Sequence, residues 1–175
     1  MRRATILTLV VALLVALTAS VAVAKIIRGT NGPDNLSGTS TADTIYARGG
    51  MDEVRGLRGN DDLFGGTGDD LLVGGTGNDK LLDGPGNDTV IGNAGNDVIN
   101  GGVGNDEYEG RGGDDRIKAA GDGERDKVNC GSGVDVAVVD LNDVVDGQVV
   151  SSVLSVGNLV GTIGSCERVE ARILQ

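Results

Sequence analysis

The sequence predicts an all-β repeat fold in which short strands stack on one another to form a solenoid. Three observations predict it: a nine-residue period runs without a gap from Gly29 to Lys118, an apolar residue recurs once in each period, and 31 of the 175 residues are glycine. Average proteins contain roughly 7% glycine, so an ordinary packed globule is not expected. Units of such a repeat bury their apolar side chains only by stacking.

Ten blocks make up the period, and they begin at residues 29, 38, 47, 56, 65, 74, 83, 92, 101 and 110. Glycine holds the first place except at Ala47 and Asp83, and the fourth place except at Thr41. The sixth place is always aspartate: Asp34, Asp43, Asp52, Asp61, Asp70, Asp79, Asp88, Asp97, Asp106 and Asp115. The eighth place is always apolar: Leu36, Ile45, Val54, Leu63, Leu72, Leu81, Val90, Ile99, Tyr108 and Ile117. The alternative, a disordered segment rich in glycine and aspartate, would not keep this register.

Each block divides into a turn and a strand. We expect the glycines of the first and fourth places to adopt positive φ and to turn main-chain carbonyls toward a common point. The three residues after the aspartate form a short strand, and the eighth-place side chain at its centre points inward. Strands of successive coils would lie about 4.8 Å apart.

These residues resemble the RTX (hemolysin-type) calcium-binding nonapeptide, G-G-x-G-x-D-x-U-x, in which U is a large apolar residue. The nearest copies are residues 65–73 and 74–82. The resemblance covers about half of the chain, and it implies a right-handed parallel β-roll with two blocks per coil and calcium in the turns. The first three blocks depart from the pattern: they lack glycine in the second place and have Pro33, Ala42 and Met51 in the fifth, where all later blocks have Asn or Asp. The resemblance therefore gives its least support for calcium binding at that end.

Two blocks per coil would sort the aspartates into two rows. One row holds Asp34, Asp52, Asp70, Asp88 and Asp106, and the other holds Asp43, Asp61, Asp79, Asp97 and Asp115. Neighbouring carboxylates would repel by about 0.9 kcal/mol in water and about 3.5 kcal/mol at an effective dielectric constant of about 20. Ca²⁺ takes roughly 6–8 oxygen ligands, so adjacent turns could share up to about eight ions. We expect a chain that is disordered without calcium and folds on binding it. The alternative is a solenoid that needs no metal.

Residues 1–24 have the three parts of a secretory signal peptide. Arg2 and Arg3 form a basic start, an apolar run follows from Ala4 to Leu17, and residues 22–24 form a small-residue cleavage site. The alternative is an uncleaved membrane anchor. Cleavage would change the formal charge from −11 to −13, and so acidic a chain is not expected to bind nucleic acid or an anionic membrane. We therefore predict a secreted, extracellular or cell-surface-associated protein.

The predicted β-roll spans residues 25–118, and residues 119–138 are interpreted as degenerate repeats. After two extra residues, Asp126-Lys127-Val128 and Asp135-Val136-Ala137 repeat at a spacing of nine. Residues 139–175 are predicted to be a β cap over the open end, with residues 149–150 and 153–154 as strand material. A small binding module is the alternative. The two cysteines, Cys130 and Cys166, are expected to form a disulfide after export, the alternative being two free thiols.

The function predicted from these features is calcium binding, with a structural or surface-interaction role and no catalysis. The chain has no histidine, which excludes histidine acid–base catalysis and zinc sites with a histidine ligand. One alternative is a calcium-dependent adhesin or scaffold. Another is a hydrolase that uses acids of the tail such as Glu167 and Glu170.

Two groups of apolar residues are expected on the outer faces of the roll. Tyr46, Phe64 and Leu82 would lie on one face, and Leu71, Val73 and Ile91 on the other. Each group would either contact an unknown surface or protein partner or be covered by the C-terminal segment.

Overall fold

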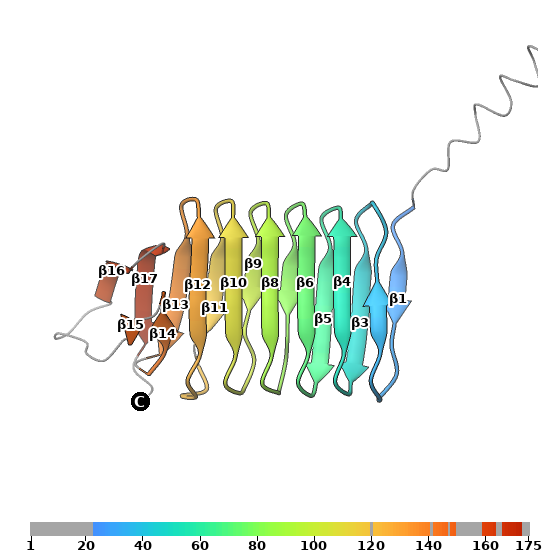
Figure 1. Cartoon of the computed structure of the whole chain (residues 1–175), viewed down its shortest axis with the longest axis horizontal. Helices are drawn as coiled ribbons and strands as arrows, with labels where there is room; N and C mark the ends of the chain where they lie inside the picture. Colours follow the sequence, from blue (N-terminus) through green and yellow to red (C-terminus); the bar gives the residue numbers. More distant parts are fainter. Residues whose placement is uncertain are drawn as a thin grey trace, which may run out of the picture.

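The computed structural model describes residues 23–119, 121–140, 142–146, 148–149, 159–163 and 166–172. These residues form seventeen strands and no helix. The strands lie side by side along one long axis, with the N-terminal coil at one end and the C-terminal strands at the other (Figure 1). The all-β parallel β-roll predicted from the sequence is confirmed, and it has about seven turns.

Up to β14, the chain alternates between two sheets. The nine-stranded sheet contains, in spatial order, β1 (Ile26–Arg28), β3 (Thr44–Gly49), β5 (Asp62–Thr67), β7 (Lys80–Leu82), β9 (Val98–Asn100), β11 (Arg116–Ala119), β13 (Val136–Asp140), β17 (Cys166–Arg172) and β16 (Leu159–Ile163). The eight-stranded sheet contains β15 (Gln148–Val149), β14 (Val144–Val145), β12 (Lys127–Ser132), β10 (Glu107–Gly112), β8 (Thr89–Ala94), β6 (Leu71–Thr76), β4 (Glu53–Arg58) and β2 (Asn35–Ser37).

Residues 1–22 of the predicted signal peptide lie outside the described residues. Within the described part of the chain, no helix has the length and apolar character needed to cross a membrane. The structure therefore describes the repeats and the strands that follow them.

Strand register confirms that two blocks make one coil. Ile45 lies opposite Leu63 in one sheet, and Val54 lies opposite Leu72 in the other, which is a step of 18 residues in each case. The step becomes 20 residues between β10 and β12, where Tyr108 lies opposite Val128. The two extra residues found in the sequence after Lys118 are thus accommodated in a turn, and the stacking of strands continues beyond it.

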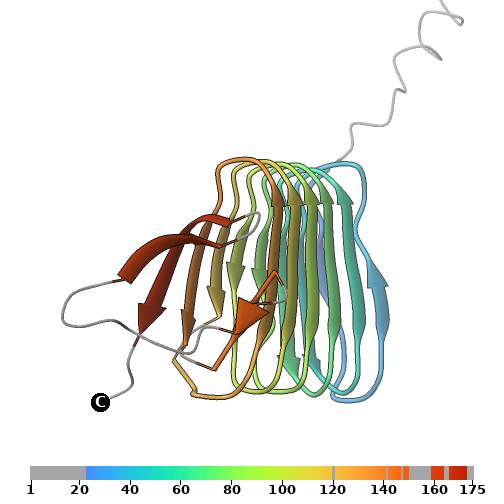
Figure 2. The same ribbon diagram turned by 60° about the vertical axis from the view of Figure 1, so that its left-hand side comes forward.

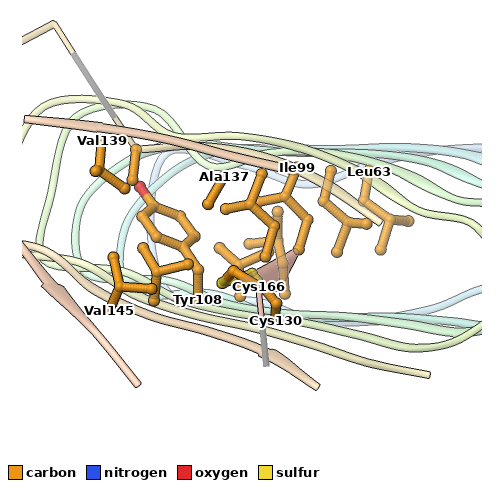
Figure 3. Packing of buried hydrophobic residues seen from close by; sticks show 14 of the residues in the cluster. Leu63, Ile99, Tyr108, Cys130, Ala137, Val139, Val145 and Cys166 are labelled. Carbon is orange, nitrogen blue, oxygen red and sulfur yellow. A yellow bond between two sulfur atoms is a disulfide. The ribbon is translucent and has the colours of Figure 1, made fainter. Parts of the chain in front are cut away.

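The core is a single file of eighth-place side chains between the two sheets. Nine of the ten are at most 1% exposed, and Leu36 of the first block is partly buried against them. Val128, Ala137 and Val145 continue the file in the later strands. Figure 3 shows these side chains enclosed between the two layers of ribbon.

Strands are longer than the three residues expected after each aspartate. β3 to β6, β8, β10 and β12 each run six residues, into the first three places of the next block. Because inward positions alternate along a strand, the sixth, eighth and first places all face the interior. Ala47, a first-place residue, is fully buried as this alternation requires.

The expectation that first-place glycines adopt positive φ is wrong. Positive φ occurs instead at the second place, in Arg48, Leu57, Gly66, Gly75, Gly84, Asn93 and Arg111, and at the fourth place, in Gly50, Gly59, Gly68, Gly77, Gly86, Gly95, Gly104 and Gly113. First-place glycines have another role, because they face the interior beside the aspartate carboxylates. Their lack of a side chain provides space there.

We predict that Gly77→Ala destabilises the folded chain by more than about 2 kcal/mol. Gly77 has a φ of +130°, and an added Cβ would collide with the main-chain oxygen of Gly59 in the preceding coil. The measurement is urea unfolding in the presence of calcium. The matched control is Gly32→Ala in the same place of the first block, because no atom lies within 4 Å of its added Cβ. The control should stay within about 0.5 kcal/mol of the parent, and equal losses in the two variants would contradict the prediction.

The C-terminal strands end the parallel stacking. β17 pairs parallel with β13, and β16 pairs antiparallel on its other side. In the other sheet β15 pairs antiparallel with β14 (Figure 2). Of the predicted strand material in this region, Val149 lies in β15, whereas residues 150, 153 and 154 lie outside the described residues.

Cys130 and Cys166 form the disulfide that the sequence predicts. Cys130 lies in β12 and Cys166 in β17, so the bond joins the eight-stranded sheet to the nine-stranded sheet. Both cysteines are fully buried, and they lie against the file of core side chains (Figure 3). The bond therefore ties β17 to the last coils.

We predict that the double variant Cys130→Ala/Cys166→Ala is less stable by about 4 kcal/mol, because the disulfide closes a loop across a sequence separation of 36 residues. Hydrogen exchange should show faster exchange in β16 and β17 than in β5 and β6 of the same variant. If β16 and β17 exchanged as slowly in the double variant as in the parent, the disulfide would not be what stabilises these strands.

Tyr46, Phe64 and Leu82 lie side by side on adjacent strands of the nine-stranded sheet, as predicted. The rings of Tyr46 and Phe64 stack with their centroids 4.7 Å apart. Among the described residues, the C-terminal strands do not cover this group, because they extend the opposite end of the sheet. On the other sheet, the predicted group has Val73 opposite Ile91, with Leu71 on the same strand as Val73.

Candidate metal centre

The sixth-place aspartates form the two predicted rows along the roll. Each aspartate closes a turn and precedes a strand, and the 18-residue register stacks members of one row on successive coils. Nine of the ten residues are at most 3% exposed, and only Asp34 in the first block is half-buried. The roll thus holds two lines of carboxyl groups in its interior.

One oxygen of each carboxylate is used by the fold itself. The main-chain N–H of Asp61 donates to Asp79 Oδ1, and the N–H of Asp79 donates to Asp97 Oδ1, both at 2.8 Å. The same bond joins every pair of neighbours in both rows at 2.7–2.8 Å. From Asp43 onward, each Oδ1 atom therefore satisfies a main-chain donor of the preceding coil and helps to fix the register.

The second oxygen of most of these carboxylates has no hydrogen-bond partner among the described residues. Such buried Oδ2 atoms belong to Asp52, Asp61, Asp70, Asp79, Asp88, Asp97 and Asp115. Asp106 Oδ2 instead accepts a hydrogen bond from Tyr108 Oη at 2.7 Å. A buried charged oxygen without a donor is costly. A repeated set of such atoms therefore fits the binding of a cation.

First-place glycines leave space for these Oδ2 atoms. A Cβ built on Gly74 would lie 2.5 Å from Asp79 Oδ2 and 2.8 Å from the main-chain oxygen of Gly92 in the next coil. At Gly65 the corresponding distances, to Asp70 Oδ2 and the Asp83 carbonyl, are both 2.7 Å. Carboxylate and carbonyl oxygens thus converge on the same interior space. Hard cations such as Ca²⁺ prefer this donor set, and the residues present fit such an ion.

The first two blocks are built differently. Thr30 donates from its N–H and its hydroxyl to Asp34 Oδ2, at 2.6 and 3.0 Å. Thr39 donates in the same way to Asp43 Oδ2, at 2.5 and 2.9 Å. Burial acts to raise the pKa of Asp43, but these bonds together with that from the Lys25 N–H lower it below the usual value. The Oδ2 atoms of both carboxylates are therefore satisfied by the protein, unlike most of those in the later blocks.

The rows continue beyond the ten regular blocks, through the residues interpreted as degenerate repeats. Asp126 Oδ1 accepts from the Asp106 N–H at 2.9 Å, and Asp143 Oδ1 accepts from the Asp126 N–H at 3.0 Å. In the other row, Asp135 Oδ1 accepts from the Asp115 N–H at 2.8 Å. The nine-residue spacing of Asp126 and Asp135 was the available signal for these two positions. Asp143 follows a step of 17 residues, for which the period offers no signal.

Fifth-place side chains form a second, exposed ladder that runs in the opposite direction. Asn60 Oδ1 accepts from the Asn78 N–H, and Asn78 Oδ1 accepts from the Asn96 N–H, both at 2.9 Å. Each fifth-place acceptor thus binds a donor of the following coil, whereas each sixth-place Oδ1 binds a donor of the preceding coil. Asn and Asp in the fifth place therefore hold successive turns together. Pro33, Ala42 and Met51 have no side-chain acceptor for this bond.

Burial raises the pKa of the sixth-place aspartates in the metal-free fold. Desolvation is the main cause, and it brings the pKa of Asp70, Asp79 and Asp115 to about 6 and that of Asp88 and Asp97 to about 7. Main-chain hydrogen bonds partly oppose this rise, and neighbouring carboxylates of the row add to it. Without a cation, these carboxyl groups therefore stay protonated to a higher pH in the folded chain than in the unfolded chain.

We predict that the metal-free fold is most stable near pH 4 and loses stability as the pH rises toward 7. A carboxyl whose pKa is higher in the folded than in the unfolded chain stabilises the fold fully below the unfolded value, 3.8. That contribution is lost as the pH passes the folded values, about 6 to about 7. Thermal unfolding followed by circular dichroism in resin-treated, calcium-free buffer measures this dependence. A melting temperature that rose between pH 4 and pH 7 would contradict the expected sign.

Comparison with protein families finds the RTX calcium-binding nonapeptide repeat (4 copies) in this sequence. The matches cover residues 28–63, 48–81 and 82–117, which together span more than half of the chain. Among curated protein sequences, none matches this one. The matched residues include all ten sixth-place aspartates.

Proposed function

The chain belongs to the family of RTX calcium-binding nonapeptide repeat proteins, and from this premise we propose that its interior rows of aspartates hold the calcium ions and that binding drives folding. Calcium binding by a structural repeat protein follows from the family. The proposal assigns the ligands to the sixth-place aspartates, Asp34 to Asp115. It places the tightest binding from Asp52 onward, where every Oδ2 atom except that of Asp106 has no donor among the described residues.

The observation that carries the proposal is the series of seven buried Oδ2 atoms without a hydrogen-bond partner in the described structure. A protein that folds without metal gains nothing from an unsatisfied carboxylate in every turn, because each one adds a desolvation cost. Thr30 and Thr39 show that this chain can satisfy such an oxygen internally where it has the residue to do so. Apart from Asp106, the aspartates of the later described turns have no such donor to Oδ2, and a bound cation would supply the charge and coordination that they lack.

Dependence of the fold on calcium follows from the charge and the thin core. The eighth-place side chains form one file, so each coil contributes only two of them to the interior. Against this stands a formal charge of −11, with aspartates of each row held on successive coils. At a Kd of about 0.1 mM, about 1 mM calcium would add roughly 1.4 kcal/mol for each site. Several sites together would match the net stability of a typical domain.

We propose that the protein is secreted, that residues 1–24 direct its export, and that it has a structural or surface-interaction role. A calcium-dependent adhesin or scaffold is a second candidate, which the uncovered stack of Tyr46 and Phe64 favours. The hydrolase alternative has less support. Glu170 is paired with Arg168 at 2.6 Å, and the sixth-place carboxylates are assigned to metal.

We predict that calcium added to the full chain in chelated buffer produces a β-strand signal in circular dichroism, and that isothermal titration counts the ions bound. Asp79→Asn should lower the calcium affinity at its turn by about tenfold, because it removes one ligand charge. Asp62→Asn, the matched control, removes an outward carboxylate on the neighbouring strand that forms a salt bridge with Lys80 at 3.5 Å. The control should bind calcium like the parent.

Two results would oppose the proposed function. At pH 7, a full β-strand signal in chelator would show that the fold does not need calcium. Equal losses of affinity in Asp79→Asn and Asp62→Asn would show that general charge, and not the interior row, governs binding.

A further inference from the structure

Asp83 interrupts the repeat at a place that faces the interior. It occupies the first place of its block, where eight of the ten blocks have glycine. The side chain is 1% exposed. Its Oδ1 accepts from the Gly84 N–H at 2.7 Å, and its Oδ2 has no hydrogen-bond partner among the described residues. Strand β7 ends at Leu82, immediately before it, whereas β5 runs three residues into the following block.

Asp88 and Asp106 complete a cluster with Asp83. Asp88 closes the turn that Asp83 opens, and Asp106 closes the corresponding turn one coil later. One carboxylate oxygen from each of the three residues lies within 4.8 Å of the other two. Two oxygens bound to the same Ca²⁺ at about 2.3–2.6 Å lie at most about 5 Å apart. The cluster therefore has the dimensions of a cation site.

Two carboxylate oxygens of this cluster have no hydrogen-bond donor, so the cluster is not a closed hydrogen-bonded network. Asp88 is 2% exposed, and its Oδ2, like that of Asp83, has no partner in the described structure. The Oδ1 atoms of Asp88 and Asp106 are already used by main-chain donors of the preceding coil, at 2.7 and 2.8 Å. None of the ion pairs formed by the described residues includes any of the three aspartates. Three buried carboxylates thus face one another without a protein cation.

Tyr108 forms one wall of the cluster. Its Oη donates to Asp106 Oδ2 at 2.7 Å, and the residue is 1% exposed. The ring lies between the two layers of the roll, with its oxygen turned away from the disulfide (Figure 3). Gly101 provides the room, because a Cβ at that position would collide with Tyr108 Oη. A buried phenol therefore stands beside the three carboxylates.

We propose that Asp83, Asp88 and Asp106 bind one calcium ion at a three-carboxylate site of higher affinity than the regular intervals between coils. This inference rests on the proposed function, since it requires the rows to take the same cation. A regular interval brings together the aspartates of two coils, and Asp83 adds a third charged ligand to one such interval. The affinity of oxygen sites for Ca²⁺ increases with the number of charged ligands. We expect this site to fill at least about tenfold earlier than the others in a titration.

The test uses Tb³⁺, which takes calcium sites and emits when excited through a nearby tyrosine. The chain has no tryptophan and two tyrosines, Tyr46 and Tyr108. Tyr46 lies on the outer face, so Tyr46→Phe should keep the sensitised emission of the full chain, whereas Tyr108→Phe should lose most of it. In the Tyr46→Phe background, Asp83→Asn should weaken Tb³⁺ binding, read through Tyr108, at least about tenfold. Glu107→Gln, which removes an exposed charge beside Asp106, is the matched control and should leave it unchanged.

Calcium competition and circular dichroism separate the possible outcomes. Asp83→Gly restores the glycine of the repeat and serves as a second variant if Asp83→Asn does not fold in saturating calcium. A loss of the tightest site in either folded variant, with the remaining sites intact, supports the proposal. Unchanged affinity in the folded variants would overturn it, as would a cluster that binds neither Tb³⁺ nor Ca²⁺ while the other sites do. A chain that gains neither ions nor order with calcium would instead refute the proposed function.

Discussion

The structure depends on aspartate carboxylates in which one oxygen accepts a main-chain hydrogen bond and the other does not. In both rows, Oδ1 takes a main-chain donor of the preceding coil, while Oδ2 remains buried without a donor in most of the described turns. The first bond sets the spacing of the coils, and the second oxygen is left as a ligand. The same group thus builds the roll and makes it costly without a cation. First-place glycine follows from this arrangement, because Gly74 gives Asp79 Oδ2 its space.

Much of the fold could be predicted because the period alone fixes which residues stack. An 18-residue coil places Ile45 against Leu63, and the two rows of aspartates follow from the same count. The roles of the glycines could not be obtained this way. Positive φ at Arg48 and Leu57 shows that the turn imposes its conformation on residues other than glycine. The spacing of residues carries no information on which main-chain angles a turn requires.

The candidate site was predictable where it is regular and not where the sequence departs from the period. Thr30 donates two hydrogen bonds to Asp34 Oδ2 within one turn. This contact depends on side-chain geometry and not on the spacing of residues. Asp143 joins its row after a 17-residue step, so counting from the repeats misses it. Asp83 could be recognised as an exception in the first place, but its proximity to Asp88 and Asp106 needed the packed coils.

The opposed directions of the two ladders have a consequence for the ends of the roll. If a second molecule stacked before the first coil, a fifth-place side chain of its last coil would take the part of Asn60. It would need a main-chain N–H from the fifth place of the first block here, in the part of Asn78. That place is Pro33, which has no N–H to offer. Stacking of a second molecule on this edge would therefore lack one hydrogen bond of the fifth-place ladder.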